Sequence, residues 1–154
     1  MNHPPTSKID ILLIEDNPHD EELILYTLKK YHITEQVVVV RDGEQALEII
    51  NNPLLNGNNL QKLLPKLILL DIKLPKVDGV GILEQIKNNP LTAGIPVVVF
   101  TSSNEEIDIM TSYRLRANAY VVKPVDAEKF ADAILRVGVY WLQHNKPLLI
   151  IDDR

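Results

Sequence analysis

Five short apolar runs alternate with helix-like segments along the chain, and this alternation limits the possible fold more than any other feature. The runs recur roughly 22–30 residues apart and are apolar rather than alternating, as expected for strands covered on both faces. Two of them are rich in β-branched residues, which favours strands over helices. The pattern predicts an α/β fold, with a doubly wound five-stranded parallel sheet and helices on both faces. The predicted strands are residues 9–14, 37–40, 67–70, 97–100 and 120–122.

The segments between the runs carry the start and stop signals of helices. Asn17 and Pro18 are expected to open the first helix, as N-cap and first-turn residue. Asn104 is expected to cap the fourth helix and Asp126 the last one, and Pro147 should stop that last helix. Leu23, Tyr26, Thr27 and Lys30 are predicted to lie on one face of the first helix.

The composition limits the class of protein. With 154 residues, 45% of them hydrophobic and 24% charged, the chain is expected to form one globular domain. Residues 9–146 are assigned to this domain, with a flexible lead-in at 1–8, a turn-rich surface loop at 51–59 and a tail at 147–154. The net charge of -5 disfavours a nucleic-acid-binding surface, and no stretch is long and apolar enough to span a membrane. The lack of cysteine excludes disulfides and thiolate chemistry and suits a cytoplasmic protein.

Two of the predicted strands stop abruptly at acidic residues. The first stops at Glu15 and Asp16, and the third stops at Asp71. Because the carboxyl ends of parallel strands meet at one edge of the sheet, these carboxylates are expected to lie together. Two such charges at about 4 Å repel by about 4 kcal/mol at an effective dielectric near 20, so the cluster requires a cation or raised pKa values. Oxygen ligands favour a hard ion, and Mg²⁺ beside a phosphate is the usual choice. The sequence therefore points to phosphoryl chemistry.

Four short motifs fall in order at the ends of different predicted strands. They are Leu-Leu-Ile-Glu-Asp-Asn at 12–17, Leu-Leu-Asp-Ile-Lys-Leu-Pro at 69–75, Thr-Ser-Ser at 101–103 and Val-Lys-Pro at 122–124. Together they closely resemble the receiver domain of two-component response regulators, over residues 9 to about 137. That family has the flavodoxin-like strand order 2-1-3-4-5.

A narrower resemblance concerns the single-domain response regulators that partner bacterial phytochrome kinases. Three stretches carry it, at residues 95–103, 112–120 and 140–142. It implies a sensor histidine kinase, of the phytochrome type, as the partner of this chain. It also implies output through contact with a downstream protein that the sequence does not identify, since no DNA-binding or enzymatic domain is expected beyond the fold.

The resemblance implies a role for each acid. Asp71 would be the phosphoacceptor, and its attack on phosphorus would depend on in-line positioning and charge neutralisation. Asp16 and Asp71 would ligate Mg²⁺ directly, and Glu15 mainly through water. The main-chain carbonyl of Lys73 would complete the metal ligands.

The resemblance also implies the residues that respond to the phosphoryl group. Lys123 would place its ammonium against the phosphoryl oxygens, and Thr101 would offer a hydroxyl to one of them. Movement of that hydroxyl would let Tyr120 rotate inward, which is a population shift between two packings. A cis peptide bond between Lys123 and Pro124 is expected to direct the lysine into the crevice.

Two residues near the site depart from the commonest pattern of the family. Lys73 lies two residues after Asp71, where relatives often carry a neutral polar residue, and Ser103 lies two residues after Thr101. Lys73 is predicted to alter the lifetime of the phosphoryl group, in a direction that the sequence does not give. The alternative is that Lys73 extends into solvent without effect.

The carboxyl-terminal region allows two interpretations. The apolar run at 148–151 could fold back on its own domain, or it could contribute to a homodimer formed by the fourth helix, the fifth strand, the last helix and the tail. Aromatic residues suit such an interface, and the candidates are Tyr113, Tyr140 and Trp141.

Three other functions compete with that of a signalling receiver, which would be no enzyme beyond its own phosphorylation and dephosphorylation. An aspartate-nucleophile phosphatase of the haloacid dehalogenase type needs a second aspartate where this chain has Lys73. A flavodoxin-like electron carrier needs a phosphate-binding loop where the chain has Glu15 and Asp16, and an acidic pair repels phosphate. A receiver that works without phosphorylation is disfavoured by the intact set of site residues.

Overall fold

A computed structural model describes residues 9–51 and 65–147 of the chain. Its centre is a sheet of five parallel strands in the order β2-β1-β3-β4-β5, which confirms the predicted fold class and strand order. The lead-in at 1–8, nearly all of the loop at 51–59 and the apolar run at 148–151 lie outside the described residues, so those predictions stay open. The strands are β1 (Ile11–Ile14), β2 (Val37–Val40), β3 (Leu67–Leu70), β4 (Val97–Thr101) and β5 (Ala119–Val122).

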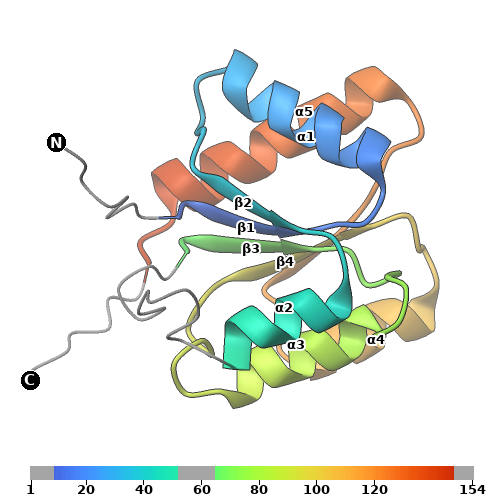
Figure 1. Cartoon of the computed structure of the whole chain (residues 1–154). Coiled ribbons are helices and arrows are strands. Elements are labelled where there is room, and N and C mark those ends of the chain that lie inside the picture. Colours follow the sequence, from blue (N-terminus) through green and yellow to red (C-terminus); the bar gives the residue numbers. More distant parts are fainter. Residues whose placement is uncertain (1–8, 52–64, 148–154) are drawn as a thin grey trace, which may run out of the picture.

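Helices cover both faces of the sheet, as Figure 1 shows. Helices α1 (Pro18–Lys30) and α5 (Ala127–Val139) pack side by side on one face. Helices α2 (Gly43–Asn51), α3 (Gly79–Asn88) and α4 (Glu106–Arg114) lie on the other. A π-helical turn over Tyr140–His144 extends α5 and ends before Pro147. In the part of the chain described here, no helix is long and apolar enough to cross a membrane.

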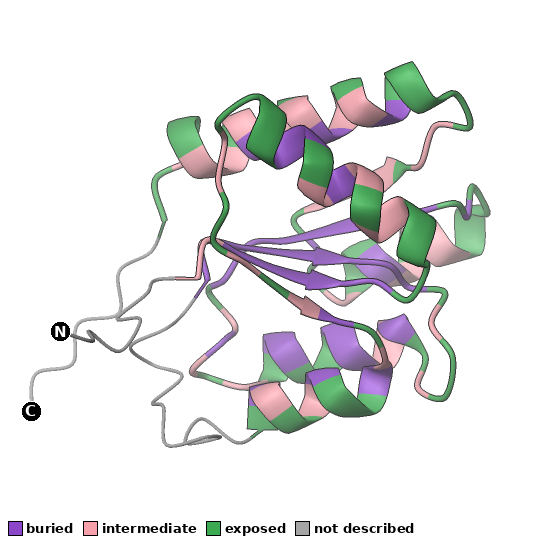
Figure 2. Ribbon diagram, turned by 45° about the horizontal axis from the view of Figure 1, so that its top comes forward, coloured by how far each residue is buried: buried purple, intermediate pink, exposed green. Residues whose placement is uncertain are grey.

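The three central strands, β1, β3 and β4, are buried on both faces, which explains their uninterrupted apolar sequence. Figure 2 shows the central strands as the buried layer between the two sets of helices. Leu12 and Ile14 of β1 belong to the core under α2 and α3, while Ile11 and Leu13 belong to the core under α1 and α5. Each such side chain, at most 4% exposed, contributes about 1.5–3 kcal/mol to folding through its burial.

Two of the three predicted helix caps are present. The side-chain oxygen of Asn17 accepts the backbone N–H groups of His19 (2.9 Å) and Asp20 (3.1 Å) at the start of α1. Asp126 accepts the N–H of Lys129 (3.0 Å) at the start of α5. The prediction for Asn104 is wrong, because α4 is preceded by Glu105, whose N–H donates to the Ser103 hydroxyl at 3.3 Å. The serine thus sets the turn and moves the helix start by one residue.

Leu23, Tyr26, Thr27 and Lys30 share one face of α1, as predicted, and line a groove beside α5, but the residues that the helix buries lie largely on another side. Ile24, Thr27 and Leu28 are its buried residues, whereas Tyr26 is 61% exposed. Residues 24 and 28 lie one turn apart, so they face the sheet and α5 together. The buried hydroxyl of Thr27 is satisfied by donating to the Leu23 carbonyl at 2.8 Å.

The start of α3 requires a glycine. Asp78 caps this helix by accepting the N–H of Val80 at 3.2 Å. A Cβ atom on Gly79 would overlap the Cα of Ile72 and lie 2.8 Å from the carbonyl oxygen of Asp71. The helix start is therefore packed directly against the backbone that follows β3.

Candidate functional site

The two acidic stops meet at the carboxyl edge of the sheet, as predicted. The N–H of Asp71 donates to Ile14 at 3.0 Å and the N–H of Glu15 donates to Val40 at 3.0 Å, so both residues continue the strand pairing by one step. Carboxylate oxygens of Glu15, Asp16 and Asp71 all lie within 4.8 Å of one another. Glu15 is 1% exposed and Asp71 is 6% exposed, while Asp16 faces solvent. The cluster is thus a half-buried group of acids with one open side.

The Asp71 carboxylate is held by three donors from three different segments. Its Oδ1 accepts the backbone N–H of Lys73 at 2.9 Å and the hydroxyl of Thr101 at 2.8 Å. Its Oδ2 accepts the ammonium of Lys123 at 2.9 Å. Charge-assisted bonds of this kind fix the orientation of the carboxylate.

The Lys123 ammonium contacts three carboxylates. It lies 2.9 Å from Glu15 Oε1, 2.9 Å from Asp71 Oδ2 and 2.8 Å from Asp20 Oδ2. The backbone N–H of Lys123 donates to the Thr101 carbonyl at 2.7 Å, which continues the pairing of β5 with β4. Sequence reasoning missed Asp20. Its position in the first turn after the Asn17 cap was the available signal, because a helix that starts at the acidic edge directs its first turn toward that edge.

The electrostatics of the site agree with crowded acids around one cation. Burial raises the pKa of Glu15 to about 7, although Lys123 acts to lower it. Burial lowers the pKa of Lys123, but hydrogen bonds to Asp20, Asp71 and Glu15 outweigh that effect and leave it above its usual value. An all-oxygen donor set with surplus negative charge fits a hard divalent cation of the Mg²⁺ or Mn²⁺ type.

The predicted cis bond between Lys123 and Pro124 is wrong. The described residues contain no cis peptide bond. With this bond trans, the lysine still reaches Asp71 at 2.9 Å, because β5 ends at the acidic edge and the lysine side chain is long enough to cross it.

Thr101 and Tyr120 lie on one side of the acid cluster. Thr101 ends β4, is fully buried and donates to Asp71. The Tyr120 hydroxyl donates to the Ser103 carbonyl at 2.9 Å, and burial raises its pKa. The Ser103 hydroxyl in turn donates to Asp108 Oδ2 at 2.5 Å. Because the Ser103 N–H also donates to the Thr101 hydroxyl at 3.5 Å, a connected set of hydrogen bonds runs from the acid cluster to the first turn of α4.

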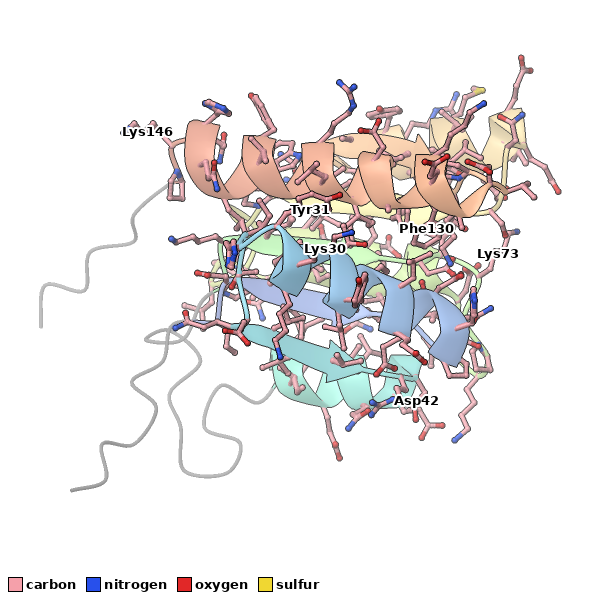
Figure 3. The ribbon with its side chains drawn as sticks, turned by 90° about the horizontal axis from the view of Figure 1, so that it is seen from above. Lys30, Tyr31, Asp42, Lys73, Phe130 and Lys146 are labelled. Carbon is pink, nitrogen blue, oxygen red and sulfur yellow. The ribbon has the colours of Figure 1, made fainter. Side chains whose placement is uncertain are left out.

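Lys73 directs its side chain away from the acids. Its ammonium lies 3.0 Å from Asp108 Oδ2, and Figure 3 shows it at the end of the sheet that carries the site. The pKa of Asp108 is lowered, mainly by the hydrogen bond from the Ser103 hydroxyl and to a lesser extent by Lys73. Lys73 thus links the loop after Asp71 to α4, so it does not extend unpaired into solvent.

This fold, with three acids, one lysine and one threonine at the carboxyl ends of its strands, defines a class of signalling protein. The family model for the response regulator receiver domain matches residues 11–135, and the chain belongs to this family. Members act in two-component signalling, in which receiver domains partner with sensor histidine kinases.

Particular relatives cover nearly the whole chain. Response regulator Rcp1 of Synechocystis is 36% identical over 86% of this chain and 88% of its own length. The crystal structure of its Mn²⁺-bound form gives a TM-score of 0.80 at 35% identity, covering 90% of this chain and 97% of that one. The phosphorylated cyanobacterial phytochrome response regulator RcpA gives 0.81 at 33% identity, covering 92% and 99%. The chain is therefore also similar to phytochrome-associated response regulators, as the narrower resemblance predicted.

An archaeal relative is named for a different role. The probable methanogenesis regulatory protein FilR2 of Methanothrix harundinacea is 36% identical over 88% of this chain and 85% of its own length. Similarity at this level therefore extends beyond the phytochrome-associated regulators.

Proposed function

We propose that this protein accepts a phosphoryl group on Asp71 from a sensor histidine kinase, in a reaction that depends on Mg²⁺. The observation that carries the proposal is the position of the Asp71 carboxylate, which shares an edge with Glu15 and Asp16 and accepts a hydrogen bond from Lys123. The Mn²⁺-bound form of Rcp1 and the phosphorylated form of RcpA support it by similarity.

In the proposed reaction, an oxygen of Asp71 attacks the phosphorus and the donor leaves with its electron pair. Glu15, Asp16, Asp71 and the carbonyl of Lys73 would hold the divalent ion, which offsets negative charge on the phosphoryl oxygens. Lys123 adds a fixed ammonium beside the same oxygens, and preorganised charge of this kind often accelerates a reaction more than any other single effect. The Lys73 N–H and the Thr101 hydroxyl orient the carboxylate for attack.

The proposed response to phosphorylation uses Thr101 and Tyr120. The Thr101 hydroxyl would leave Asp71 Oδ1 for a phosphoryl oxygen, and Tyr120 would give up its bond to the Ser103 carbonyl and move inward. This shift would rearrange the surface over α4 and β5, where a downstream protein would read it.

The proposed partners follow from the relatives. A kinase of the phytochrome type fits the similarity to RcpA. A homodimer through α4, β5 and α5 would use Tyr113 and Tyr140, which are 49% and 52% exposed, and Trp141, which packs edge-on against Tyr140 at 4.9 Å between ring centroids. Light scattering at micromolar concentration tests the dimer, and a monomeric mass contradicts it.

The phosphatase alternative has less support. Its general acid would occupy the position two residues after the nucleophile, and that position carries the ammonium of Lys73, 3.0 Å from Asp108. The bond to Asp108 raises the pKa of this ammonium, so it is a far weaker acid than the carboxylic acid that the role requires.

The test is incubation with acetyl phosphate, with and without Mg²⁺, followed by intact mass measurement. The expected result is one added phosphoryl group that requires Mg²⁺ and is lost in Asp71→Asn. The matched control is Asp132→Asn, an exposed acid on α5 paired with Arg136, which should keep the modification. Uptake that persists in Asp71→Asn contradicts the proposal.

A further inference from the structure

Lys123 contacts one carboxylate, that of Asp20, which lies outside the cluster of Glu15, Asp16 and Asp71. An ammonium group has three donors, and here each has a carboxylate acceptor, on Glu15, Asp20 and Asp71. Among the described residues, the acids that could jointly hold an ion are Glu15, Asp16 and Asp71. Asp20 is not in that group, so its bond to Lys123 is separate from the ion site.

Asp20 is fixed by the helix that carries it. The Asn17 cap accepts its N–H at 3.1 Å and thereby holds the first turn of α1 in place. The Asp20 side chain is 19% exposed and the Lys123 side chain is 8% exposed, so the bond between them is well shielded from solvent. The chain separation of 103 residues makes it a tertiary contact between the two ends of the domain.

The other two acceptors of Lys123 change their partners during the proposed reaction. Glu15 and Asp71 turn toward a divalent ion, and Asp71 gains a phosphoryl group. If they were the only acceptors, Lys123 would compete with the ion for the same oxygens and would lose its anchor when they turned away. Asp20 lies outside the ion site, so its bond to Lys123 can persist while the other two acceptors change partners.

We propose that Asp20 is a positioning residue for Lys123, which keeps the ammonium in the crevice while Glu15 and Asp71 exchange partners. This inference rests on the proposed phosphorylation of Asp71 and assigns one further residue to that reaction. The bond is charge-assisted, so its loss should cost more than the loss of a neutral hydrogen bond.

The first experiment measures the rate of phosphoryl uptake from acetyl phosphate at saturating Mg²⁺. Asp20→Ala should slow uptake about tenfold, as expected for the loss of one hydrogen bond between charged groups. Asp20→Asn should fall between this variant and the wild type, because its amide oxygen still accepts a bond without the charge. Glu22→Ala is the matched control, since it removes an exposed acid from the same helix, and it should leave the rate unchanged.

A double-variant comparison separates positioning from a general effect of charge or folding. In a Lys123→Met background, adding Asp20→Ala should not slow the residual uptake further, because the group that Asp20 positions is gone. A second measurement needs no phosphorylation. The ¹H–¹⁵N signal of the Lys123 ammonium, identified by its loss in Lys123→Met, should be present in the wild type and in Glu22→Ala and be lost in Asp20→Ala.

The results distinguish failure of the role of Asp20 from failure of the proposed function. Unchanged uptake in Asp20→Ala, an equal further loss in the Lys123→Met background, or a retained ammonium signal in Asp20→Ala overturns the role of Asp20 alone. Failure of the wild type to take up a phosphoryl group on Asp71 overturns the proposed function and this role with it. Thermal melting of Asp20→Ala establishes that it is folded at the assay temperature, and Asp20→Asn carries the test if it is not.

Discussion

Two buried lysines lie at opposite ends of the same sheet, and they differ in the charge of the groups that accept their hydrogen bonds. Lys123 at the carboxyl edge has an 8% exposed side chain and donates to three carboxylates. Lys87 at the amino edge is 6% exposed and donates to neutral acceptors, the carbonyls of Ala93 (3.2 Å) and Ile95 (2.9 Å) and the side-chain oxygen of Asn118 (2.9 Å). Burial lowers the pKa of Lys87 to about 8, whereas the pKa of Lys123 is raised.

The two lysines are buried to a similar extent, so the charge of their acceptors, rather than burial, distinguishes their surroundings. Lys87 joins the end of α3 to the segments before β4 and β5, and Asn118 also accepts the N–H of Val97 at 2.8 Å. Arg116 strengthens the same corner by donating to the Lys87 carbonyl at 2.7 Å. At the other edge, the surplus of acids leaves oxygens available to an ion. At the amino edge the buried ammonium therefore donates to neutral acceptors, whereas at the carboxyl edge the carboxylates outnumber the cation.

The strongest test of this comparison replaces each lysine with methionine and measures phosphoryl uptake. Lys123→Met should slow uptake from acetyl phosphate by about a hundredfold or more, because a preorganised charge at the reacting oxygens is lost. Lys87→Met should stay within about twofold of the wild type, measured where both variants are folded. Similar losses in the two variants would remove the distinction between the edges.

At saturating Mg²⁺, Lys87→Met should lower the free energy of unfolding more than Lys123→Met does, which reverses the order expected for phosphoryl uptake. Lys87→Met should lower the free energy of unfolding by about 2–4 kcal/mol, because it leaves buried carbonyl and amide oxygens without a donor. Addition of Mg²⁺ should not restore this loss. In Lys123→Met, the ion should recover much of the stability, since it can replace the missing positive charge. Urea unfolding with and without Mg²⁺ measures both, and recovery of Lys87→Met by the ion would contradict the prediction.

The opposite pKa shifts predict different pH dependences. Lys87 has a pKa of about 8 in the folded chain and 10.5 ordinarily, so between these values the unfolded chain binds more protons and stability rises with pH. The pKa of Lys123 is raised, so its contribution is present below its ordinary pKa and is lost only as pH rises through the raised value. Urea midpoints from pH 8 to pH 10.5 should show the stability difference between the wild type and Lys87→Met growing with pH. A constant or shrinking difference would contradict the assignment.

A third lysine gives the smallest expected effect. Lys73 is 53% exposed and pairs with Asp108, so Lys73→Asn should change stability little. Asp108→Asn should cost more, because it also weakens the bond from the Ser103 hydroxyl. Both should change the dephosphorylation rate of the phosphorylated protein, because Lys73→Asn removes the ammonium and Asp108→Asn frees it from its partner, so that it can turn toward the site. Asp132→Asn, which breaks the exposed pair with Arg136, should leave that rate unchanged. Equal rates in the wild type and Lys73→Asn would show that the lysine has no influence on the phosphoryl group.

Features that depend on neighbouring residues were predictable from the sequence. The strands at 37–40 and 67–70 were predicted with their observed limits, because their apolar or β-branched composition is local. The meeting of Glu15, Asp16 and Asp71 followed from parallel topology, since it needs only the strand ends and not the side-chain rotamers.

Features that depend on how elements pack were not predictable. The exposed position of Tyr26 follows from the rotation of α1 against α5, which the helical period alone does not fix. The bond from Lys123 to Asp20 joins residues 103 positions apart and requires the helix and the strand to be placed first. The N-cap of α4 is Glu105 rather than Asn104, because the preceding turn is held by the Ser103 hydroxyl, which accepts the N–H of Glu105 and donates to Asp108.

The close packing of Gly79 against the backbone of Asp71 and Ile72 has a mechanical consequence. Backbone-to-backbone contact leaves no space on the α3 side, so the segment after β3 cannot yield in that direction. On the opposite side, Thr101, Ser103 and Tyr120 are held by hydrogen bonds that can be exchanged for others. Around Asp71, the side toward α3 is therefore rigid, whereas the hydrogen-bonded side can rearrange. A bulky group added to Asp71 would displace residues on the α4 side before any partner is present.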